Sequence, residues 1–464
     1  MELKKYKLGE CLELLRGYDL TSSQMQGGEV AVVGSNGIIG YHNSQRGNSP
    51  CITVGRSGSV GKVHYYEQQT WAHNTALFVK DFKGNNPKYL YYLLKNLHLD
   101  NIFEKGSSVI PSLDRKLVHS LVVPFHKEIN DQRKIVAVLS AIDHKIELNK
   151  QINDNLEAMA KQLYDYWFVQ FDFPNEDGKP YKSSGGAMVW NDKLKREIPQ
   201  GWSISNVKSL IEPIERGISY SSDDLLDPFA TPMINLACFS KAGDYRLGEM
   251  KFFSGKVSND KLISPIDMLI ACTDMTQGAD IIGRPILASD EYDQYTFSTD
   301  LALITPKGKF KMYLYYTLRT PFYHKYIRPF ASGTTVKHLN LIGVENYGLP
   351  VPPIEIQSKF EDLITPIKEK QSKNLNEINA LTKQRDELLP LLMNGQATVN
   401  YHLSAKVYPL PTAYKKAMPI VANQIKVPWK TCVVPRISYD SSYYCCLDCN
   451  YFLSNYLTIA AFSR

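Results

Sequence analysis

Residues 131–168 read DQRKIVAVLSAIDHKIELNKQINDNLEAMAKQLYDYWF, and residues 356–393 read IQSKFEDLITPIKEKQSKNLNEINALTKQRDELLPLLM. In both stretches apolar side chains return every seven residues, with a second partial stripe between them. This is the pattern of long helices that pack lengthwise against a partner helix. The stretches align without a gap at an offset of 225 residues, which pairs Ile135 with Phe360, Ile142 with Ile367, Leu156 with Leu381, and Leu163 with Leu388.

The segments in front of the two helices repeat as well. Tyr-Leu-Tyr-Tyr at 89–92 recurs at 313–316, and Gly-Ser-Ser-Val at 106–109 recurs as Gly-Thr-Thr-Val at 333–336. A period this long indicates a duplicated domain, because solenoid units measure only ~20–50 residues. Each copy alternates short β-type runs with glycine turns and contains a helical stretch. We therefore predict an α+β fold in which two duplicated α/β domains are separated by two long antiparallel coiled-coil helices.

The duplication divides the chain into six segments. These are a first domain (1–127), a first spacer helix (128–172), a turn-rich linker (173–199), a second domain (200–353), a second spacer helix (354–395) and a tail (396–464). The tail has no counterpart after the first helix and no periodicity. We expect it to be disordered or foreign to the fold, and an out-of-frame product is one such origin.

The formal net charge of +6 does not by itself indicate binding to nucleic acid. Of the 53 Lys and Arg residues and 47 Asp and Glu residues, seven and two lie in residues 401–464, so residues 1–400 carry 46 basic and 45 acidic side chains. Nucleic-acid binding would thus need a local basic patch. No apolar run approaches the ~20 residues that span a bilayer, and Met1–Glu10 lacks the apolar region of a signal peptide. We expect a cytoplasmic protein that does not enter a membrane.

Catalytic and metal-binding motifs are missing from the sequence. The run Gly55–Lys62 approaches a phosphate-binding loop, but Arg56 replaces the first glycine and Val63 replaces the magnesium-binding hydroxyl. Cysteines in the tail offer the one candidate zinc set, without regular spacing: Cys432, Cys445, Cys446 and Cys449. Cysteines of the body are expected to be small buried side chains: Cys11, Cys51, Cys238 and Cys272. We predict no catalytic site and no metal site.

Two kinds of turn are candidate contacts for phosphates and base edges. The glycine-hinged turn at 55–62 presents Arg56, Ser57, Ser59 and Lys62. The repeated glycine–hydroxyl turns present Ser107 and Ser108 in the first copy, and Thr334, Thr335 and Lys337 in the second. In both cases the alternative is an ordinary turn with solvated side chains. The tyrosine repeats are expected in the core.

The order of these motifs resembles the specificity (S) subunit of type I restriction–modification enzymes, over residues 1–395. The run 55–63 is similar to the family's Arg-x-Gly-x-x-Gly loop, and a strand expected at 71–79 follows it. The glycine–hydroxyl turns match the segment before the family's Leu-x-x-Pro-x-Pro-Pro-x-x-x-Gln run, which is found at 349–357. The first copy of that run is degraded. The second copy replaces the basic loop by residues 273–278, as expected where two domains read different DNA.

The resemblance implies two target recognition domains that read a bipartite site on double-stranded DNA. It implies a chain with no catalytic activity and no cofactor of its own. The implied partners are two methyltransferase (M) subunits and, through them, restriction/translocase (R) subunits, which would hold S-adenosylmethionine, ATP and Mg. Two other interpretations stay open: a two-headed protein-binding scaffold without DNA recognition, and an inactive remnant of an S subunit.

Helix length and sequence symmetry also predict a register. Antiparallel helices of ~57 Å with their midpoints together would place Asn149 beside Asn374. The same axis pairs apolar residues only: Ile142 with Leu381, Ile135 with Leu388, Leu156 with Ile367, and Leu163 with Phe360. One buried polar pair can fix a helix register. The alternative is that both asparagines face solvent.

Overall fold

The computed structural model describes residues 2–103, 112–225, 230–240 and 243–399, which lie in one compact unit. The first domain has the strands β1 (Leu3–Lys7), β2 (Glu13–Arg16), β3 (Val30–Gly34), β4 (Gly37–His42), β5 (Cys51–Gly55), β6 (Val63–Tyr66), β7 (Thr70–Ala72), β8 (Ala76–Asp81) and β9 (Val122–His126). Its helices are α1 (Leu8–Cys11), α2 (Pro87–Asn96), α3 (Leu99–Phe103) and α4 (Arg115–Ser120).

The second domain begins with a hairpin and continues with the same kinds of element. Its strands are β10 (Met188–Asn191), β11 (Arg196–Pro199), β12 (Ser203–Asn206), β13 (Glu215–Arg216), β14 (Thr231–Ile234), β15 (Lys251–Phe253), β16 (Met268–Ala271), β17 (Thr273–Asp274), β18 (Pro285–Leu287), β19 (Thr296–Phe297), β20 (Leu301–Ile304), β21 (Ala331–Ser332), β22 (Lys337–Leu339) and β23 (Gly348–Val351). Its helices are α6 (Val207–Leu210), α7 (Lys311–Thr317), α8 (Pro321–Ile327) and α9 (Ile342–Glu345).

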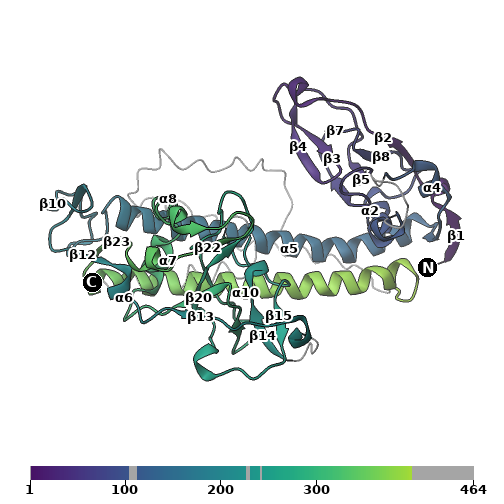
Figure 1. The fold of residues 1–464 in the computed structure, drawn as a ribbon. Helices are drawn as coiled ribbons and strands as arrows, with labels where there is room; N and C mark the ends of the chain where they lie inside the picture. Colours follow the sequence, from purple (N-terminus) through teal and green to yellow (C-terminus); the bar gives the residue numbers. More distant parts are fainter. Residues whose placement is uncertain (1, 104–111, 226–229, 241–242, 400–464) are drawn as a thin grey trace, which may run out of the picture. The chain divides into compact units, whose positions relative to one another are not determined.

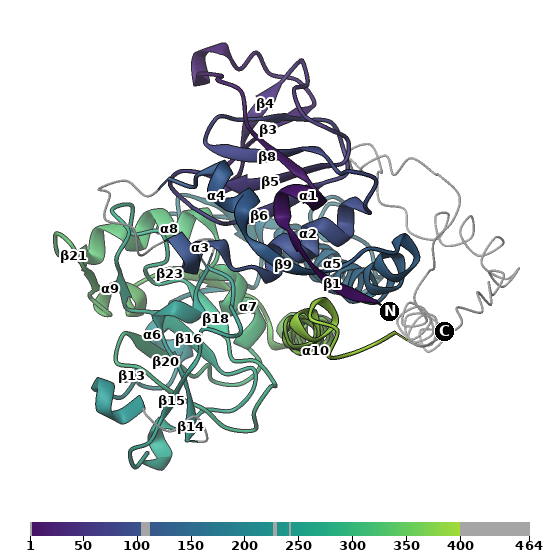
Figure 2. The ribbon, with the colours of Figure 1, turned by 90° about the vertical axis from the view of Figure 1, so that its right-hand side faces the viewer.

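Both domains are built on the same pair of sheets. Figure 2 shows strands β3, β4, β5 and β8 of the first domain and β13, β14, β16 and β20 of the second. A four-stranded sheet has the order β2-β8-β5-β6 in the first domain and β13-β20-β16-β18 in the second. A three-stranded sheet has the order β4-β3-β7 and β15-β14-β19, and its central strand has one antiparallel and one parallel neighbour in each copy. A further antiparallel pair, β1–β9 or β12–β23, joins the first and last strands of each repeat. The internal duplication is thus a duplication of topology.

Two long helices follow the domains. Helix α5 spans Ile129–Tyr164 and continues as a π-helical turn, Asp165–Val169. Helix α10 spans Ile354–Met393 and ends at Asn394, with Gly395 in the left-handed region at φ 70°. Glycine after the last turn is a common helix stop, because it adopts this conformation without strain.

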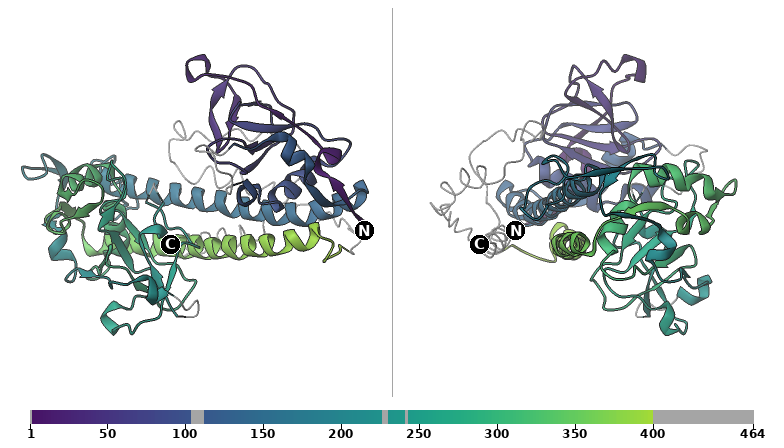
Figure 3. Two further views of the ribbon diagram at one scale, coloured as in Figure 1. Left: turned by 45° about the vertical axis from the view of Figure 1, so that its right-hand side comes forward. Right: turned by 90° about the vertical axis from the view of Figure 1, so that its left-hand side faces the viewer.

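The helices run in opposite directions. Asp143 of α5 contacts Arg385 of α10, whereas Glu157, further along α5, contacts Lys368, which comes earlier in α10. Figures 1 and 3 show the two helices side by side. Along the contact, the residue numbers therefore rise in α5 while they fall in α10.

The two central asparagines are buried, each 2% exposed. The Asn149 amide donates to Glu377 at 2.8 Å, and the Asn374 amide donates to Asn153 at 2.9 Å. Each therefore bonds to the facing helix rather than to the other asparagine. These partners lie three or four residues from the symmetric positions, so the helices are shifted by up to roughly one turn from the symmetric register.

Each domain completes its core with both long helices. The first core takes Ile135 and Leu139 from the start of α5 and Leu389 and Met393 from the end of α10. The second core takes residues from the end of α5 and the start of α10, including Leu156, Tyr164, Trp167, Phe168, Ile356, Phe360, Ile364 and Ile367. The two cores therefore engage different ends of the helix pair.

Several details differ from the sequence-based expectations. The linker 173–199 is not only turns, since it holds the β10–β11 hairpin, whose connection is closed by Asn191 accepting from the backbone of Lys193 and Leu194. The expected strand at 71–79 is two strands, because the Ala76 amide bonds back to the His73 carbonyl at 3.0 Å and turns the chain. Four-residue strands and short turns leave little periodicity in a sequence.

Other expectations are confirmed in the described residues. The repeated tyrosines lie in the core, with Tyr89, Tyr92, Tyr313, Tyr315 and Tyr316 all buried. The cysteines Cys11, Cys51, Cys238 and Cys272 are free and buried. The tail cysteines lie outside the described residues.

Candidate nucleic-acid interface

The turn 55–62 links β5 to β6 in the first domain. Its backbone is closed by bonds from the Gly55 amide to the Lys62 carbonyl at 2.8 Å and from the Gly61 amide to the Gly55 carbonyl at 2.9 Å. Gly58 and Gly61 have φ of 82° and 80°, and a Cβ at Gly55 would collide with the carbonyl oxygen of Ser59. The glycines are therefore required by the backbone of a tight hairpin turn.

The side chains of this turn are accessible and positively charged. Arg56, Ser57 and Ser59 are half-buried, and Lys62 is exposed. Lys62 donates to the Asn36 amide oxygen at 2.8 Å. Within the described residues neither Arg56 nor Lys62 forms an ion pair, so both charges are available to an anionic ligand.

The glycine–hydroxyl turns are only partly described. Ser107 and Ser108 lie outside the described residues. Thr334 and Thr335 are exposed in the turn between β21 and β22, and the Lys337 ammonium donates to the Gly333 carbonyl at 2.7 Å. The turn has the geometry of an ordinary hairpin connection, with two exposed hydroxyl-bearing side chains at its tip.

The equivalent of turn 55–62 in the second domain is the longer loop 272–284 between β16 and β18. It is closed by the same backbone bonds, from Ala271 to the Arg284 carbonyl at 3.2 Å and from Gly283 to the Ala271 carbonyl at 2.8 Å, so Arg284 stands where the first domain has Lys62. The loop also carries Asp274, which is 1% exposed and whose carboxylate accepts from the amides of Thr276 at 2.7 Å and Ile281 at 2.8 Å. The second loop thus keeps one cation and adds a buried acid that organises its backbone.

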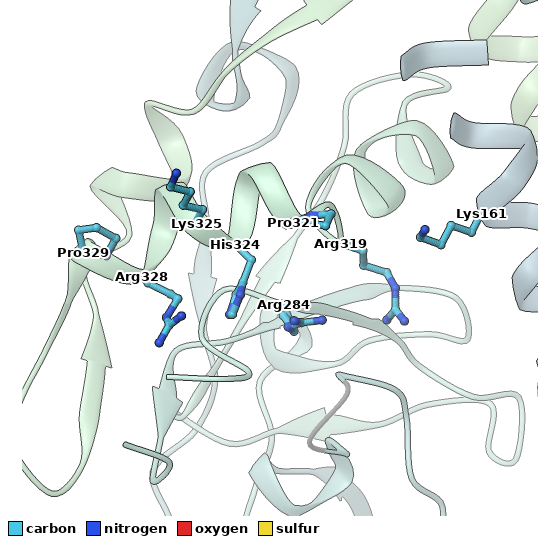
Figure 4. A pocket seen from close by; sticks show the side chains of 8 residues that line it. All are labelled: Lys161, Arg284, Arg319, Pro321, His324, Lys325, Arg328 and Pro329. Atoms are coloured by element: carbon cyan, nitrogen blue, oxygen red, sulfur yellow. The ribbon is translucent and has the colours of Figure 1, made fainter. Parts of the chain in front are cut away.

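Basic side chains gather elsewhere in the second domain, around α8. They line a hollow of about 700 Å³ together with two prolines (Figure 4), and they are Lys161, Arg284, Arg319, His324, Lys325 and Arg328. In Figure 4 the side chains of Arg284, His324 and Arg328 converge on the same side of α8. We call this group of residues the basic hollow.

Part of the basic hollow is neutralised and rigid. Arg319 donates to Asp244 at 2.6 Å and to the Gly243 carbonyl at 2.8 Å, and Glu157 lies 3.8 Å away. Lys161 pairs with Asp165 at 3.4 Å. Among the described residues, Lys325 and Arg328 are exposed and have no acidic partner, so the hollow keeps a local excess of positive charge.

The remaining groups of the basic hollow respond to that excess. Burial lowers the pKa of His324, and the charge of Arg284 lowers it further. Burial also lowers the pKa of Arg284, followed by the charge of Arg319. His324 donates to the Ala279 carbonyl at 3.1 Å, which orients its ring. A phosphate in the hollow would relieve this repulsion.

Sequence analysis missed the basic hollow for a structural reason. His324, Lys325 and Arg328 are neighbours on one helix, and their spacing in 321–330 was the available signal. Arg284 and Arg319 come from distant segments and join them only in the folded chain. No pattern in one stretch of sequence reveals a cluster assembled from three elements.

Other chemistries find no matching arrangement. Within the described residues no group of three His, Cys, Asp or Glu side chains is placed to hold a metal ion. Burial raises the pKa of the Cys11 and Cys238 thiols to about 11 and that of Cys272 to about 12, so they are protonated and unreactive at neutral pH. Over the same part of the chain, none of the helices combines the length and apolarity needed to cross a bilayer.

A repeated α+β domain with a long helix after each copy is the architecture of this chain. The family model described as the type I restriction modification DNA specificity domain matches residues 2–158 and 199–383. The chain therefore belongs to the family of type I restriction–modification specificity subunits.

Relatives and solved structures agree with this family. The MjaIX specificity subunit of Methanocaldococcus jannaschii is 28% identical over 324 residues, which cover 67% of this chain and 69% of the relative. The HindI specificity subunit of Haemophilus influenzae is 23% identical over 367 residues, covering 67% and 77%. The crystal structure of a type I S subunit from M. genitalium has a TM-score of 0.56 at 16% identity, covering 84% of this chain and 96% of that one. The fold is shared over most of both chains.

Proposed function

We propose that this chain is the non-catalytic DNA-reading subunit of a type I restriction–modification enzyme and that each domain reads one half of a bipartite site. The observation that carries this proposal is the pairing of one repeated fold with two different basic surfaces. The turn at 55–62 serves the first domain, and the basic hollow serves the second. Domains that read different half-sites need the same frame and different contacts.

The helix pair then acts as a spacer. In this proposal α5 and α10 form an antiparallel coiled coil that holds one reading domain at each end. The two half-sites would lie about one to two turns of B-DNA apart, since the duplex repeats every ~34 Å and the helices are ~57 Å long. Helix length would set the spacing, and base contacts would set the sequence.

The catalytic steps belong to partner subunits. We propose two M subunits and R subunits recruited through them, with S-adenosylmethionine, ATP and Mg bound by those partners. The relatives' names support the system, and the lack of a metal cluster or reactive thiol in the described residues is compatible with a chain that only binds.

The test is a genome-wide comparison of DNA methylation. Genomic DNA is compared between cells that express this chain with its M partner and cells that express the M partner alone. We expect a single bipartite motif, methylated only when the chain is present, and no methylation by the purified chain with S-adenosylmethionine. Methylation by the chain alone would refute the non-catalytic assignment. A missing motif, together with DNA affinity that does not fall with salt, would favour the protein-binding scaffold.

A further inference from the structure

Two charge pairs join α5 to α10, one towards each end of the helix pair; of their four side chains Lys368 is buried and the others are half-buried. At the first domain, Arg385 of α10 donates to Asp143 of α5 at 3.0 Å, and the Tyr92 hydroxyl donates to the same carboxylate at 2.6 Å. The Arg385 side chain is 15% exposed and the Asp143 side chain 27% exposed. Because water screens such a pair poorly, the signs of the two facing charges affect which helices can associate.

The second domain has the corresponding arrangement. Lys368 of α10 donates to Glu157 of α5, and the Tyr316 hydroxyl donates to the same carboxylate at 3.4 Å. Burial acts to raise the pKa of Glu157, but the charges of Lys368 and Arg319 outweigh it and keep the carboxyl group ionised. The Lys368 side chain is only 8% exposed.

The two arrangements place opposite charges at equivalent positions of each domain's own helix, although their partners on the facing helix are not equivalent, since Arg385 aligns with Ala160 and Glu157 with Thr382. Tyr316 aligns with Tyr92 at the 224-residue offset, and Lys368 aligns with Asp143 at the 225-residue offset of the helices. In the first copy the domain's own helix supplies the acid and the other helix the base. In the second copy the domain's own helix supplies the base and the other helix the acid.

This reversal decides which helices can pair. If a second α5 replaced α10 in the same register, its Asp143 would take the place of Lys368 and face Glu157. If a second α10 replaced α5, its Lys368 would take the place of Asp143 and face Arg385. Each like-with-like pair would therefore hold two repulsions between largely half-buried charges, where the native pair holds two attractions.

We propose that the α5–α10 seam is a heterotypic pairing surface: its partner is the other half of the same chain, and its charges reject a second copy of the same half. The seam thereby keeps one first domain with one second domain and prevents assemblies with two identical domains. The proposal concerns association of the halves, and its readouts need no DNA.

The experiment cuts the folded chain and asks which halves re-associate. A protease site is placed in the exposed turn at Asp177–Gly178 of the full-length chain. One preparation carries a tag on the first half, and a second preparation is isotope-labelled and untagged. Both are cut after folding and mixed in mild denaturant. The tagged first halves are then captured, and the bound fragments are identified by mass spectrometry. Labelled second halves on the tag demonstrate exchange. We expect at most about one labelled first half for every ten labelled second halves; equal recovery of both would overturn the proposal.

A single substitution should change the preference. Asp143→Lys places a cation against Arg385 in the native pair and against Glu157 in a pair of two α5 helices. We expect it to raise capture of first halves by first halves at least about tenfold. Glu147→Lys makes the same charge change on the exposed face of α5, where the Glu147 carboxylate accepts from Gln151 at 3.1 Å, and it should leave capture unchanged. No gain from Asp143→Lys would overturn the charge argument.

A measurement on the uncut chain covers the case in which the halves do not survive cutting. Asp143→Lys should lower the thermal midpoint, and adding Arg385→Glu should restore at least half of the loss, because the pair is re-formed with its signs exchanged. Glu147→Lys with Arg385→Glu is the matched control and should show no such restoration. The proposal would be overturned if the thermal midpoint of the double variant Asp143→Lys/Arg385→Glu fell by the sum of the decreases in the two single variants.

Discussion

The first and second domains share their sheets and differ in their charged surfaces. The four-stranded sheet has equivalent strands in the same order in both copies. After the third strand of that order, the first domain has the cations Arg56 and Lys62, whereas the second has a longer loop with the buried Asp274 and a single cation, Arg284. The second domain adds further cations around α8.

The difference shows which parts of a duplicated protein are free to change. Both cores depend on the ends of the same two helices, so a change there affects the register of the whole chain. The loop after the third strand differs between the copies in length and in buried residues, since Ile281 and Ile282 of loop 272–284 enter the cores, yet the strand order of the sheet is unchanged. Recognition can therefore diverge while the frame is retained.

The largest effect should come from the residue that links the second domain to the helix pair. Arg319→Ala removes the contacts to Asp244 and Glu157 and leaves the Glu157 carboxylate with one cation fewer. We expect the free energy of unfolding to fall by about 2–3 kcal/mol, measured by chemical denaturation.

The counterpart in the first domain provides the control for Arg319. Lys95 aligns with Arg319 at the 224-residue offset, but burial lowers its pKa, and the charge of Arg385 lowers it further. Lys95→Ala should therefore change stability by less than about 0.5 kcal/mol. Equal losses in the two variants would mean that the two domains are attached to the helices in the same way.

DNA binding through the second domain should depend on the basic hollow. Arg284→Ala combined with Arg328→Ala removes two cations that converge in Figure 4. We expect the assembled complex to bind its methylome-defined site about a hundredfold more weakly, with a salt slope smaller by about two. Lys307→Ala, an exposed cation outside the hollow, is the control.

Half-site substitutions sharpen that experiment. The double variant should become insensitive to scrambling of the second half-site and stay sensitive to scrambling of the first. If it loses sensitivity to neither half-site, the basic hollow is not part of the DNA-reading surface, and the second domain must read DNA through another face.

The turn of the first domain should give a smaller effect of the same kind. Arg56→Ala removes one half-buried cation, and we expect about tenfold weaker binding with selective loss of first half-site discrimination. Ser112, which bridges to Ser57 through the backbone, can be changed to Ala as a control for the turn itself. Unchanged affinity would mean that Arg56 is an ordinary surface charge.

The sequence predicts the long-range order of this fold better than its local detail. Heptad spacing persists over five repeats, so α5 and α10 and their burial of Asn149 and Asn374 can be anticipated. The register differs slightly, because Glu377 and Asn153 compete for the two amides. Strands of two to four residues, such as β10 and β17, leave too few positions for a pattern.

The two candidate binding surfaces also differ in how far they can be predicted from the sequence. The turn at 55–62 lies in one stretch and was found through its glycines and cations. The basic hollow was not found, because Lys161, Arg284 and Arg319 come from separate elements and meet only through tertiary packing. Contacts made within one turn are visible in a sequence, whereas contacts between elements require the fold.

The smallest expected effect is a pH dependence that belongs to the second domain alone. Burial and then the charge of Arg284 hold the pKa of His324 below its ordinary value, so the imidazole is neutral at pH 7. Its contribution to folding is therefore present above the unfolded pKa and is lost as pH falls through the folded pKa.

A DNA phosphate in the basic hollow acts in the opposite direction and favours the protonated ring. DNA binding should consequently take up a proton, and affinity for the second half-site should rise about threefold between pH 7.5 and pH 6. His324→Gln should abolish this rise. His64→Gln should not, although burial and then the charge of Lys62 lower the pKa of His64 beside the first domain's turn. Fluorescence anisotropy with each half-site scrambled in turn measures both variants, and a rise that persists in His324→Gln would remove the imidazole from the DNA-reading surface.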